Sequence, residues 1–257
     1  MACRISRSEE WALRLEHESH GKEGCFVTLT YSDNPESLSK SELQKFIKRL
    51  RERVDTKLKY YACGEYGDLN GRPHYHLILI GWMPKDLYKV SYRGMSSKLI
   101  EDLWKYGYNV VAPITGEDIR YVTGYVRKKL YGKRKEEYGD KMPPFALMSL
   151  GIGKEFVEKN EDKILKGYLM KKGKKIGVPR YYQKLLDSRY DDYKMMLQAR
   201  GSVYREEQVQ EYYNELESVS SDRNKKIHTL ECLERSDMER RRKLMEGFEK
   251  NIKKGML

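Results

Sequence analysis

The sequence lacks the long apolar runs that insert a chain into a membrane. No stretch approaches the roughly 20 consecutive apolar residues that a transmembrane helix needs. No signal peptide opens the chain, and no Gly-x-x-x-x-Gly-Lys-Ser/Thr segment occurs, so we expect no P-loop ATPase on this chain. These absences predict a soluble, cytoplasmic protein with no membrane partner.

Cysteine, histidine and phenylalanine are scarce. The four cysteines (Cys3, Cys25, Cys63 and Cys232) show no Cys-x-x-Cys spacing, which predicts reduced thiols rather than a disulfide framework or a zinc cluster. Only five histidines occur, and two of them are separated by a single residue. Five phenylalanines stand beside 21 tyrosines. We therefore expect some tyrosines in the core, while others offer flat faces on which bases can stack.

Positive charge is abundant. Lys and Arg total 51 against 39 for Asp and Glu, a formal net charge of +12 in 257 residues. A balance this basic indicates a polyanionic partner or a charge-rich helical tail. The length fits one large domain or a domain with an appendage.

The apolar pattern predicts an α+β fold. Strands are expected where β-branched and aromatic residues are enriched, over Cys25–Tyr31, Tyr60–Glu65, His74–Ile80 and Tyr108–Ile114. Helices are expected where apolar residues recur at a period of 3.6, over Glu9–Glu16, Ser39–Val54, Ser96–Tyr106, Gly116–Leu130 and Lys154–Ile164. The order β, α, β, β, α, β predicts a three- or four-stranded antiparallel sheet with helices on one face, as in ferredoxin-like, split βαβ folds. A basic turn is expected at Lys171–Lys175, and a charged helical segment from Gln183 onward.

A candidate metal site lies in the third predicted strand and the turn before it. Alternate side chains of a strand leave the same face, so His74 and His76 stand side by side. Pairing with the preceding strand would bring Glu65 beside them, with Asp68 in the turn as an alternative ligand. Two imidazoles and a carboxylate suit Mn²⁺, Mg²⁺ or Zn²⁺, and the spacing does not choose among these ions.

The helix predicted over Gly116–Leu130 carries two tyrosines one turn apart. Tyr121, Tyr125 and Lys128 share a face roughly opposite the apolar stripe. A phenol beside a metal site and a basic surface is suited to cleaving a DNA phosphodiester through a covalent tyrosine link.

Three segments, in this order, resemble the motifs of HUH endonucleases: Phe26–Tyr31, Arg72–His76 and Tyr121–Lys129. The likeness is strongest to the rolling-circle replication initiators of small single-stranded DNA phages, the gokushovirus branch of the microviruses, and it runs from about residue 3 to 185. It implies that His74, His76 and Glu65 bind Mg²⁺ or Mn²⁺.

The resemblance also implies roles for the helix and for the DNA contacts. Tyr125 matches the nucleophile, because Lys128 follows it in the Tyr-x-x-Lys pattern, and Tyr121 matches the partner tyrosine of two-tyrosine phage initiators. The remaining polar and basic residues of the three motifs are expected to contact DNA: Thr28, Thr30, Arg72, Arg127 and Lys129.

The function implied is initiation of rolling-circle replication in the cytoplasm of a bacterial host. The origin strand would be nicked to give a 5′-phosphotyrosine and a free 3′-hydroxyl, and strand transfer would then close unit-length circles. A host helicase and polymerase are the expected partners besides origin DNA. The domains expected are a nuclease core with an N-terminal helix over residues 1–140, a family-specific part over 141–204 packed on it, and a helical, partly mobile tail over 205–257.

Two other functions fit part of the pattern. A tyrosine transposase of the same superfamily would share the metal pair, but the second tyrosine and the additional chain length argue against it. A non-catalytic nucleic-acid-binding protein would need only the positive charge.

Overall fold

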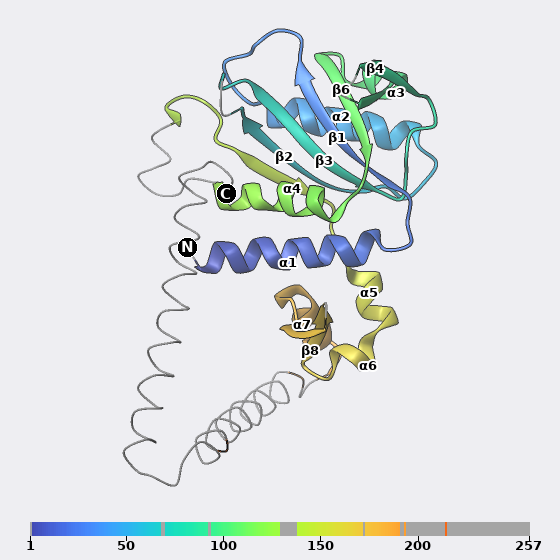
Figure 1. The fold of residues 1–257 in the computed structure, drawn as a ribbon, viewed down its shortest axis with the longest axis vertical. Helices are drawn as coiled ribbons and strands as arrows, with labels where there is room; N and C mark the ends of the chain where they lie inside the picture. Colours follow the sequence, from blue (N-terminus) through green and yellow to red (C-terminus); the bar gives the residue numbers. More distant parts are fainter. Residues whose placement is uncertain are drawn as a thin grey trace. The chain divides into compact units, whose positions relative to one another are not determined.

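The computed structural model describes residues 2–67, 70–91, 94–128, 138–171, 173–190, 193 and 214. The chain divides into two compact units, Met1–Lys159 and Asn160–Leu257 (Figure 1). The predicted tail over 205–257 lies outside the described residues apart from Asn214. In the part of the chain that is described, no helix combines the length and the apolar character that a membrane span requires.

The first unit contains one large sheet with helices. Its elements, in chain order, are α1 (Ala2–Ser19), β1 (Gly24–Tyr31), α2 (Lys40–Arg53), β2 (Lys59–Tyr66), β3 (Pro73–Ile80), β4 (Leu87–Ser91), β5 (Gly94–Ser97), α3 (Lys98–Leu103), β6 (Gly107–Pro113), α4 (Gly116–Lys128), β7 (Phe145–Met148) and α5 (Lys154–Lys159).

The seven strands pair in the order β4-β5-β6-β1-β3-β2-β7, and every neighbouring pair is antiparallel. The four central strands, β6-β1-β3-β2, have the order of a split βαβ fold, because β3 lies between β1 and β2. The predicted α+β class with an antiparallel sheet is therefore confirmed. The predicted number of strands is wrong, because β4, β5 and β7 extend the sheet at its two edges.

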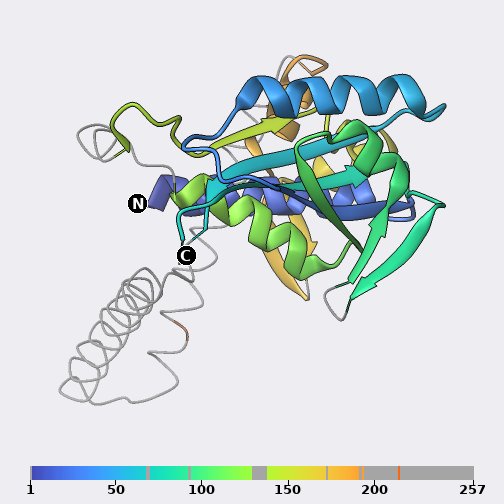
Figure 2. The same ribbon diagram turned by 90° about the horizontal axis from the view of Figure 1, so that it is seen from above.

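Helices cover both faces of the sheet, so the prediction of helices on one face is also wrong. One core lies under α2 and includes Leu43, Phe46, Val27 and Leu77. The other lies under α1 and α4 and includes Leu15, Val122, Ile78 and Ile80. Figure 2 shows α2 on one side of the strands, with α1 and α4 on the other. The physical reason is visible in β3, which is apolar at consecutive positions and so buries both of its faces.

The helix predicted over Ser96–Tyr106 is shorter than expected. Its first residues are the end of β5, and α3 begins only at Lys98. Ser97 caps this helix by accepting a hydrogen bond from the Ile100 amide at 3.2 Å. The helix ends before Trp104, which is fully buried and donates its indole N–H to the carbonyl of Thr30 at 2.9 Å.

The second unit contains α6 (Glu161–Ile164), a hairpin of β8 (Tyr168–Lys171) and β9 (Lys174–Gly177), and α7 (Arg180–Asp187). The single helix predicted over Lys154–Ile164 is wrong, because Asn160 leaves helical geometry with a ψ of 27° and separates α5 from α6. The predicted basic turn is only the tip of the hairpin, at Gly173 with a φ of +76°, and its outer lysines belong to the two strands.

The domain boundary predicted near residue 140 differs from this division into units. Strand β7 follows that boundary and pairs with β2 at the edge of the large sheet, with Gly64 opposite Phe145. The sequence prediction assigned no strand to this segment, which follows the Pro143-Pro144 pair.

A buried ion cluster fixes α1 in the first unit. The Glu18 carboxylate is 2% exposed and accepts hydrogen bonds from Lys22 Nζ at 2.7 Å, Lys59 Nζ at 2.8 Å and the Gly153 amide at 2.7 Å. Burial raises the pKa of Glu18, but the two lysines and the amide outweigh burial, and the net shift is downward. The cluster ties α1, β2 and the turn before α5 together.

We expect Glu18→Gln to lower the free energy of unfolding by about 3 kcal/mol at pH 7, because two lysines lose their buried counter-ion. The folded-state pKa of Glu18 lies below its ordinary value of 4.5, so the carboxylate stabilises the fold fully above pH 4.5. That stabilisation is lost as the pH falls below 4.5 toward the folded-state pKa. Urea unfolding at pH 7 and below pH 4.5 should show the difference between wild type and variant shrink.

A matched control is Glu158→Gln, which removes an exposed carboxylate 3.7 Å from Lys154 Nζ. An exposed pair of this kind contributes little, so the change should stay below about 0.5 kcal/mol. Equal losses in the two variants would contradict the assignment of a buried cluster.

Candidate active site

The candidate site is built on the β2–β3 hairpin. Its turn is closed by the Gly67 amide, which donates to the Arg72 carbonyl at 3.0 Å, and Gly71 has a φ of +59° that favours glycine. The register pairs Glu65 with His74 and Cys63 with His76. Directly opposite residues of an antiparallel pair point to the same face, so the three side chains meet on the face that α4 also covers.

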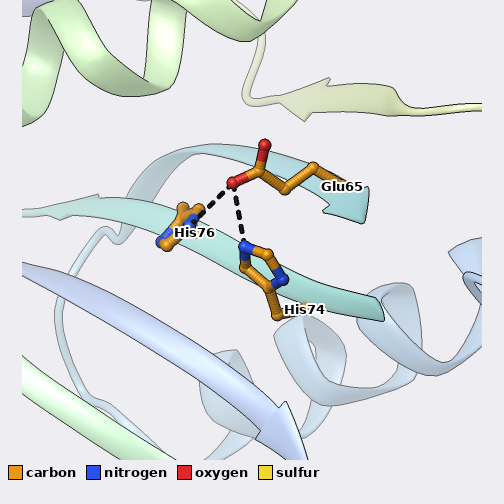
Figure 3. A group of neighbouring side chains, drawn as sticks. All are labelled: Glu65, His74 and His76. Atoms are coloured by element: carbon orange, nitrogen blue, oxygen red, sulfur yellow. Dashed lines mark hydrogen bonds and ion pairs between the residues drawn. The ribbon is translucent and has the colours of Figure 1, made fainter. Parts of the chain in front are cut away.

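One carboxylate oxygen contacts both histidines. Glu65 Oε1 lies 2.8 Å from His74 Nε2 and 3.1 Å from His76 Nε2 (Figure 3). One ligand atom from each residue lies within 4.8 Å of the others. Glu65 is 4% exposed and His76 is 6% exposed, so the group is shielded from bulk water.

The far nitrogens of the two rings are also held. His74 Nδ1 lies 3.0 Å from the Arg72 carbonyl, and because a carbonyl can only accept, Nδ1 carries the proton there. A neutral His74 therefore presents the Nε2 lone pair to Glu65. His76 Nδ1 lies 3.0 Å from Thr28 Oγ1, which can accept the same kind of bond. Outer partners of this type orient histidines that bind metals.

The ring of His76 is held between two aromatic rings. Phe26 stacks on one side, with 5.5 Å between centroids and 10° between planes. Tyr125 stacks with 5.9 Å between centroids and 13° between planes. This packing restricts rotation of the imidazole, so Nε2 stays directed at Glu65.

Both tyrosines of α4 reach the group. The Tyr121 hydroxyl lies 3.4 Å from Glu65 Oε1 and 3.5 Å from His76 Nε2. Tyr125 forms a side-chain hydrogen bond with Glu65, and the two phenol rings pack edge to face at 4.8 Å. The two differ in access to solvent, because Tyr121 is 49% exposed and Tyr125 is 6% exposed.

The site holds Glu65 ionised and the two phenols neutral. Burial raises the pKa of Glu65, but hydrogen bonds from His74, His76 and Tyr125 outweigh it and lower the pKa to about 2. Burial lowers the pKa of His76, with the contact to Glu65 opposing the shift. Burial raises the pKa of Tyr121 to about 12. Burial and the hydrogen bond to Glu65 raise the pKa of Tyr125 far above its ordinary value.

The donor set fits a divalent cation. In the neutral form of His74, a nitrogen lone pair faces a carboxylate lone pair at 2.8 Å, and two lone pairs at this distance repel unless a positive charge lies between them. A proton or a metal ion can supply that charge. Two imidazole nitrogens and one carboxylate oxygen are a common ligand set for divalent transition metals.

Two of the residues predicted to contact DNA also hold the end of β1. The Arg72 guanidinium donates to the Tyr31 carbonyl at 2.9 Å, although the residue is exposed. Thr30 Oγ1 lies 3.5 Å from the Tyr108 carbonyl. Both side chains therefore have a structural contact besides any contact with DNA.

Four predicted residues cannot be placed around the site. Arg127 and Lys128 belong to the last turn of α4, but their side chains lie outside the described structure. All of Lys129 lies outside it, and so does Asp68, the alternative ligand in the turn.

Sequence reasoning missed two contributors to the site. Thr28 was predicted to contact DNA, whereas its hydroxyl lies against His76. Phe26 was not identified, although it alternates with Thr28 and Thr30 along β1 and so belongs to the same face. That period of two was the available signal, but it identifies the face and not the neighbour across the sheet.

Comparison with known proteins gives the family. A family model described as a replication-associated protein of the ORF2 type matches residues 24–130. The chain is 32% identical over 217 residues to replication-associated protein ORF2 of Spiroplasma virus 4, covering 75% of this chain and 67% of that protein. It is 32% identical over 202 residues to replication-associated protein VP4 of Bdellovibrio phage phiMH2K, covering 70% of this chain and 64% of that protein.

A third relative, replication-associated protein ORF4 of Chlamydia phage 1, is 32% identical over 256 residues, covering 84% of this chain and 61% of that protein. The chain thus spans about two thirds of the length of these relatives. No solved structure matches. The family match begins at Gly24 in β1 and ends just after α4, so it encloses all the residues that form the site. The chain belongs to this family of phage replication-associated proteins, as its motifs predicted.

Proposed function

We propose that this protein initiates rolling-circle replication by nicking and rejoining a single DNA strand through a tyrosine. The observation that carries the proposal is the convergence of five side chains on one face of the sheet. Glu65 contacts His74 and His76, and both phenols of α4 contact Glu65. The names of the relatives support a replication role, and the convergence supports this particular chemistry.

The proposed metal site consists of Glu65, His74 and His76, with Mg²⁺ or Mn²⁺ as the ion. A divalent cation held there supplies positive charge that neutralises the oxygens of the reacting phosphate. Thr28 and the Arg72 carbonyl keep the two imidazoles in the orientation that aims both Nε2 atoms at Glu65.

The proposed nucleophile is a phenol of α4. Its oxygen bonds to phosphorus while the bond from phosphorus to the 3′ oxygen breaks. The phenol loses its proton and the departing 3′ oxygen gains one, so the products are a 5′-phosphotyrosine and a free 3′-hydroxyl. The raised pKa of both phenols means that neither is ionised at pH 7, so deprotonation has to accompany attack.

Two tyrosines permit two successive transfers. The sequence assigns the first cleavage to Tyr125, because Lys128 follows it, and the second to Tyr121. Both hydroxyls contact the same carboxylate, so one bound phosphate could be reached by either. A second transfer by the other phenol would join the strand ends and close a circle.

The decisive experiment is detection of a covalent protein–DNA adduct. Wild type incubated with Mn²⁺ and single-stranded phage origin DNA should yield an adduct that survives denaturing gels. The double variant Tyr121→Phe with Tyr125→Phe should lose it by roughly 10⁴-fold or more, because the nucleophile is gone. His76→Ala should lose cleavage and keep DNA binding. An adduct from the double variant would contradict the proposal.

Single variants assign the two phenols. We expect Tyr125→Phe to abolish the first adduct while DNA binding is kept. Tyr121→Phe should nick once and fail to release closed circles, measured by gel analysis of a two-origin substrate. Full circle yield from Tyr121→Phe would show that its hydroxyl takes no part, and both Phe variants keep the ring packing against His76 as an internal control.

Thr28→Val tests the support of the metal site without DNA. Valine keeps the shape of threonine but cannot bond His76 Nδ1, so Mn²⁺ affinity should fall by about 10- to 100-fold. Electron paramagnetic resonance of free Mn²⁺ measures this directly. Thr30→Val is the matched control, because Thr30 lies on the same face of β1 and its hydroxyl contacts the Tyr108 carbonyl instead of a histidine. Equal losses in the two variants would refute the role given to Thr28.

A further inference from the structure

Two rows of side chains run across the sheet from the metal-site histidines. In the first row, Glu65 pairs with His74, His74 with Thr30, and Thr30 with Tyr108. In the second row, His76 pairs with Thr28 and Thr28 with Val110. Directly opposite residues share a face, so the residues of both rows lie on one surface. We call Thr28, Thr30, Tyr108 and Val110 the open face.

The open face is exposed although it is partly apolar. Tyr108 is 65% exposed and Val110 is 37% exposed, while Asn109 between them is buried on the other side of the sheet. The helices α1 and α4 pack over the β3-β2-β7 half of this side. Among the described residues of the first unit, no helix packs over β1 and β6 on this side, as Figure 2 also shows.

The register that places Tyr108 here is fixed by its neighbour. A Cβ on Gly107 would lie 2.3 Å from the Thr30 carbonyl oxygen and 2.4 Å from the Ser32 amide, so only glycine allows β6 to approach β1 this closely. Ser32 donates its amide to the Tyr106 carbonyl at 2.8 Å at the same point. The tyrosine is therefore held at a defined position opposite Thr30.

We propose that the open face is a base-stacking platform for the single-stranded DNA that enters the active site, with Tyr108 as the stacking ring. The proposal rests on the proposed nuclease function and adds a binding subsite to it. Tyr108 lies two strands from His74, roughly 10 Å at the usual spacing of strands. A base beside the reacting phosphate can reach across that distance.

Three observations favour a nucleic acid as the occupant. The face is continuous with the site, because Thr28 contacts His76 directly. On the opposite side of the histidines the sheet is filled by α4 and α1, so a strand bound there has this direction left to follow. The chain carries a formal charge of +12, which attracts a polyanion.

The size of the face argues against a stable protein partner. Its exposed apolar part consists of Tyr108 and Val110, whereas a specific protein interface buries more than about 1,000 Å². A single aromatic ring beside small hydroxyl side chains is instead sufficient to stack one base, whatever its identity.

The test is binding of a 15-nucleotide oligo(dT) in EDTA, followed by fluorescence anisotropy. Tyr108→Leu should weaken binding by about 5- to 150-fold, the range for loss of one base–aromatic stack, while Tyr108→Phe should bind like wild type. An abasic oligonucleotide of the same length should bind wild type and Tyr108→Leu equally, because it offers no base to stack. Equal affinity of wild type and Tyr108→Leu for oligo(dT) would overturn the proposal.

Tyr60→Leu is the matched control, because it removes a tyrosine ring from the opposite face of the same sheet. Its affinity for oligo(dT) should be unchanged, and thermal unfolding checks that all variants are folded. A loss in Tyr108→Leu that persists on the abasic oligonucleotide, or a change in mass by sedimentation without a change in DNA affinity, would also overturn the platform.

These outcomes are separable from failure of the nuclease. Binding in EDTA needs no metal and no covalent step, whereas adduct formation by wild type needs both. A wild type that forms the adduct together with a Tyr108→Leu variant of unchanged affinity would reject only the platform. A wild type that stacks oligo(dT) on Tyr108 but never forms an adduct would reject only the nuclease.

Discussion

The structure depends on one contact, between the Glu65 carboxylate and the Nε2 atoms of His74 and His76. It joins two neighbouring strands on a face from which water is largely excluded, so its geometry is set by the register of the hairpin and not by flexible side chains. A shift of one residue in that register would turn both imidazoles to the opposite face. The phenols of α4, the Thr28 hydroxyl and the Arg72 carbonyl all take their positions relative to this contact.

The two faces of the sheet have different tasks. The face under α2 is a continuous core, with Val27, Leu77 and Leu79 fully buried. The face under α4 is divided, because α1 and α4 cover one half and leave β1 and β6 open. The reacting groups lie at the border between these halves. A border of this kind combines a low-dielectric surrounding, which strengthens electrostatic interactions, with access for a long polymer substrate.

Much of the fold could be predicted because the central elements carry strong local patterns. β1, β2, β3 and β6 alternate or run apolar within clear turns, and α2 and α4 show a 3.6-residue stripe. The edges were harder. β5 is the four-residue segment Gly94–Ser97, which has no pattern of its own and runs straight into α3, and β7 follows two prolines. Asn160 splits a helix that periodicity alone joins, because a single residue outside helical geometry leaves the apolar spacing unchanged.

The sequence by itself determined the metal-binding candidates, the pair of tyrosines and the family, because each depends on residue types at short, fixed spacings. It also determined that Glu65 belongs with the histidines, since a hairpin joins strands that are adjacent in the chain. Only the tertiary structure decided that Thr28 supports His76, that Phe26 and Tyr125 hold the same ring, and that Tyr108 continues the row from His74. These contacts join strands and helices separated by about 30 to 100 residues, and their pairing results from the packing of whole elements, which no local pattern encodes.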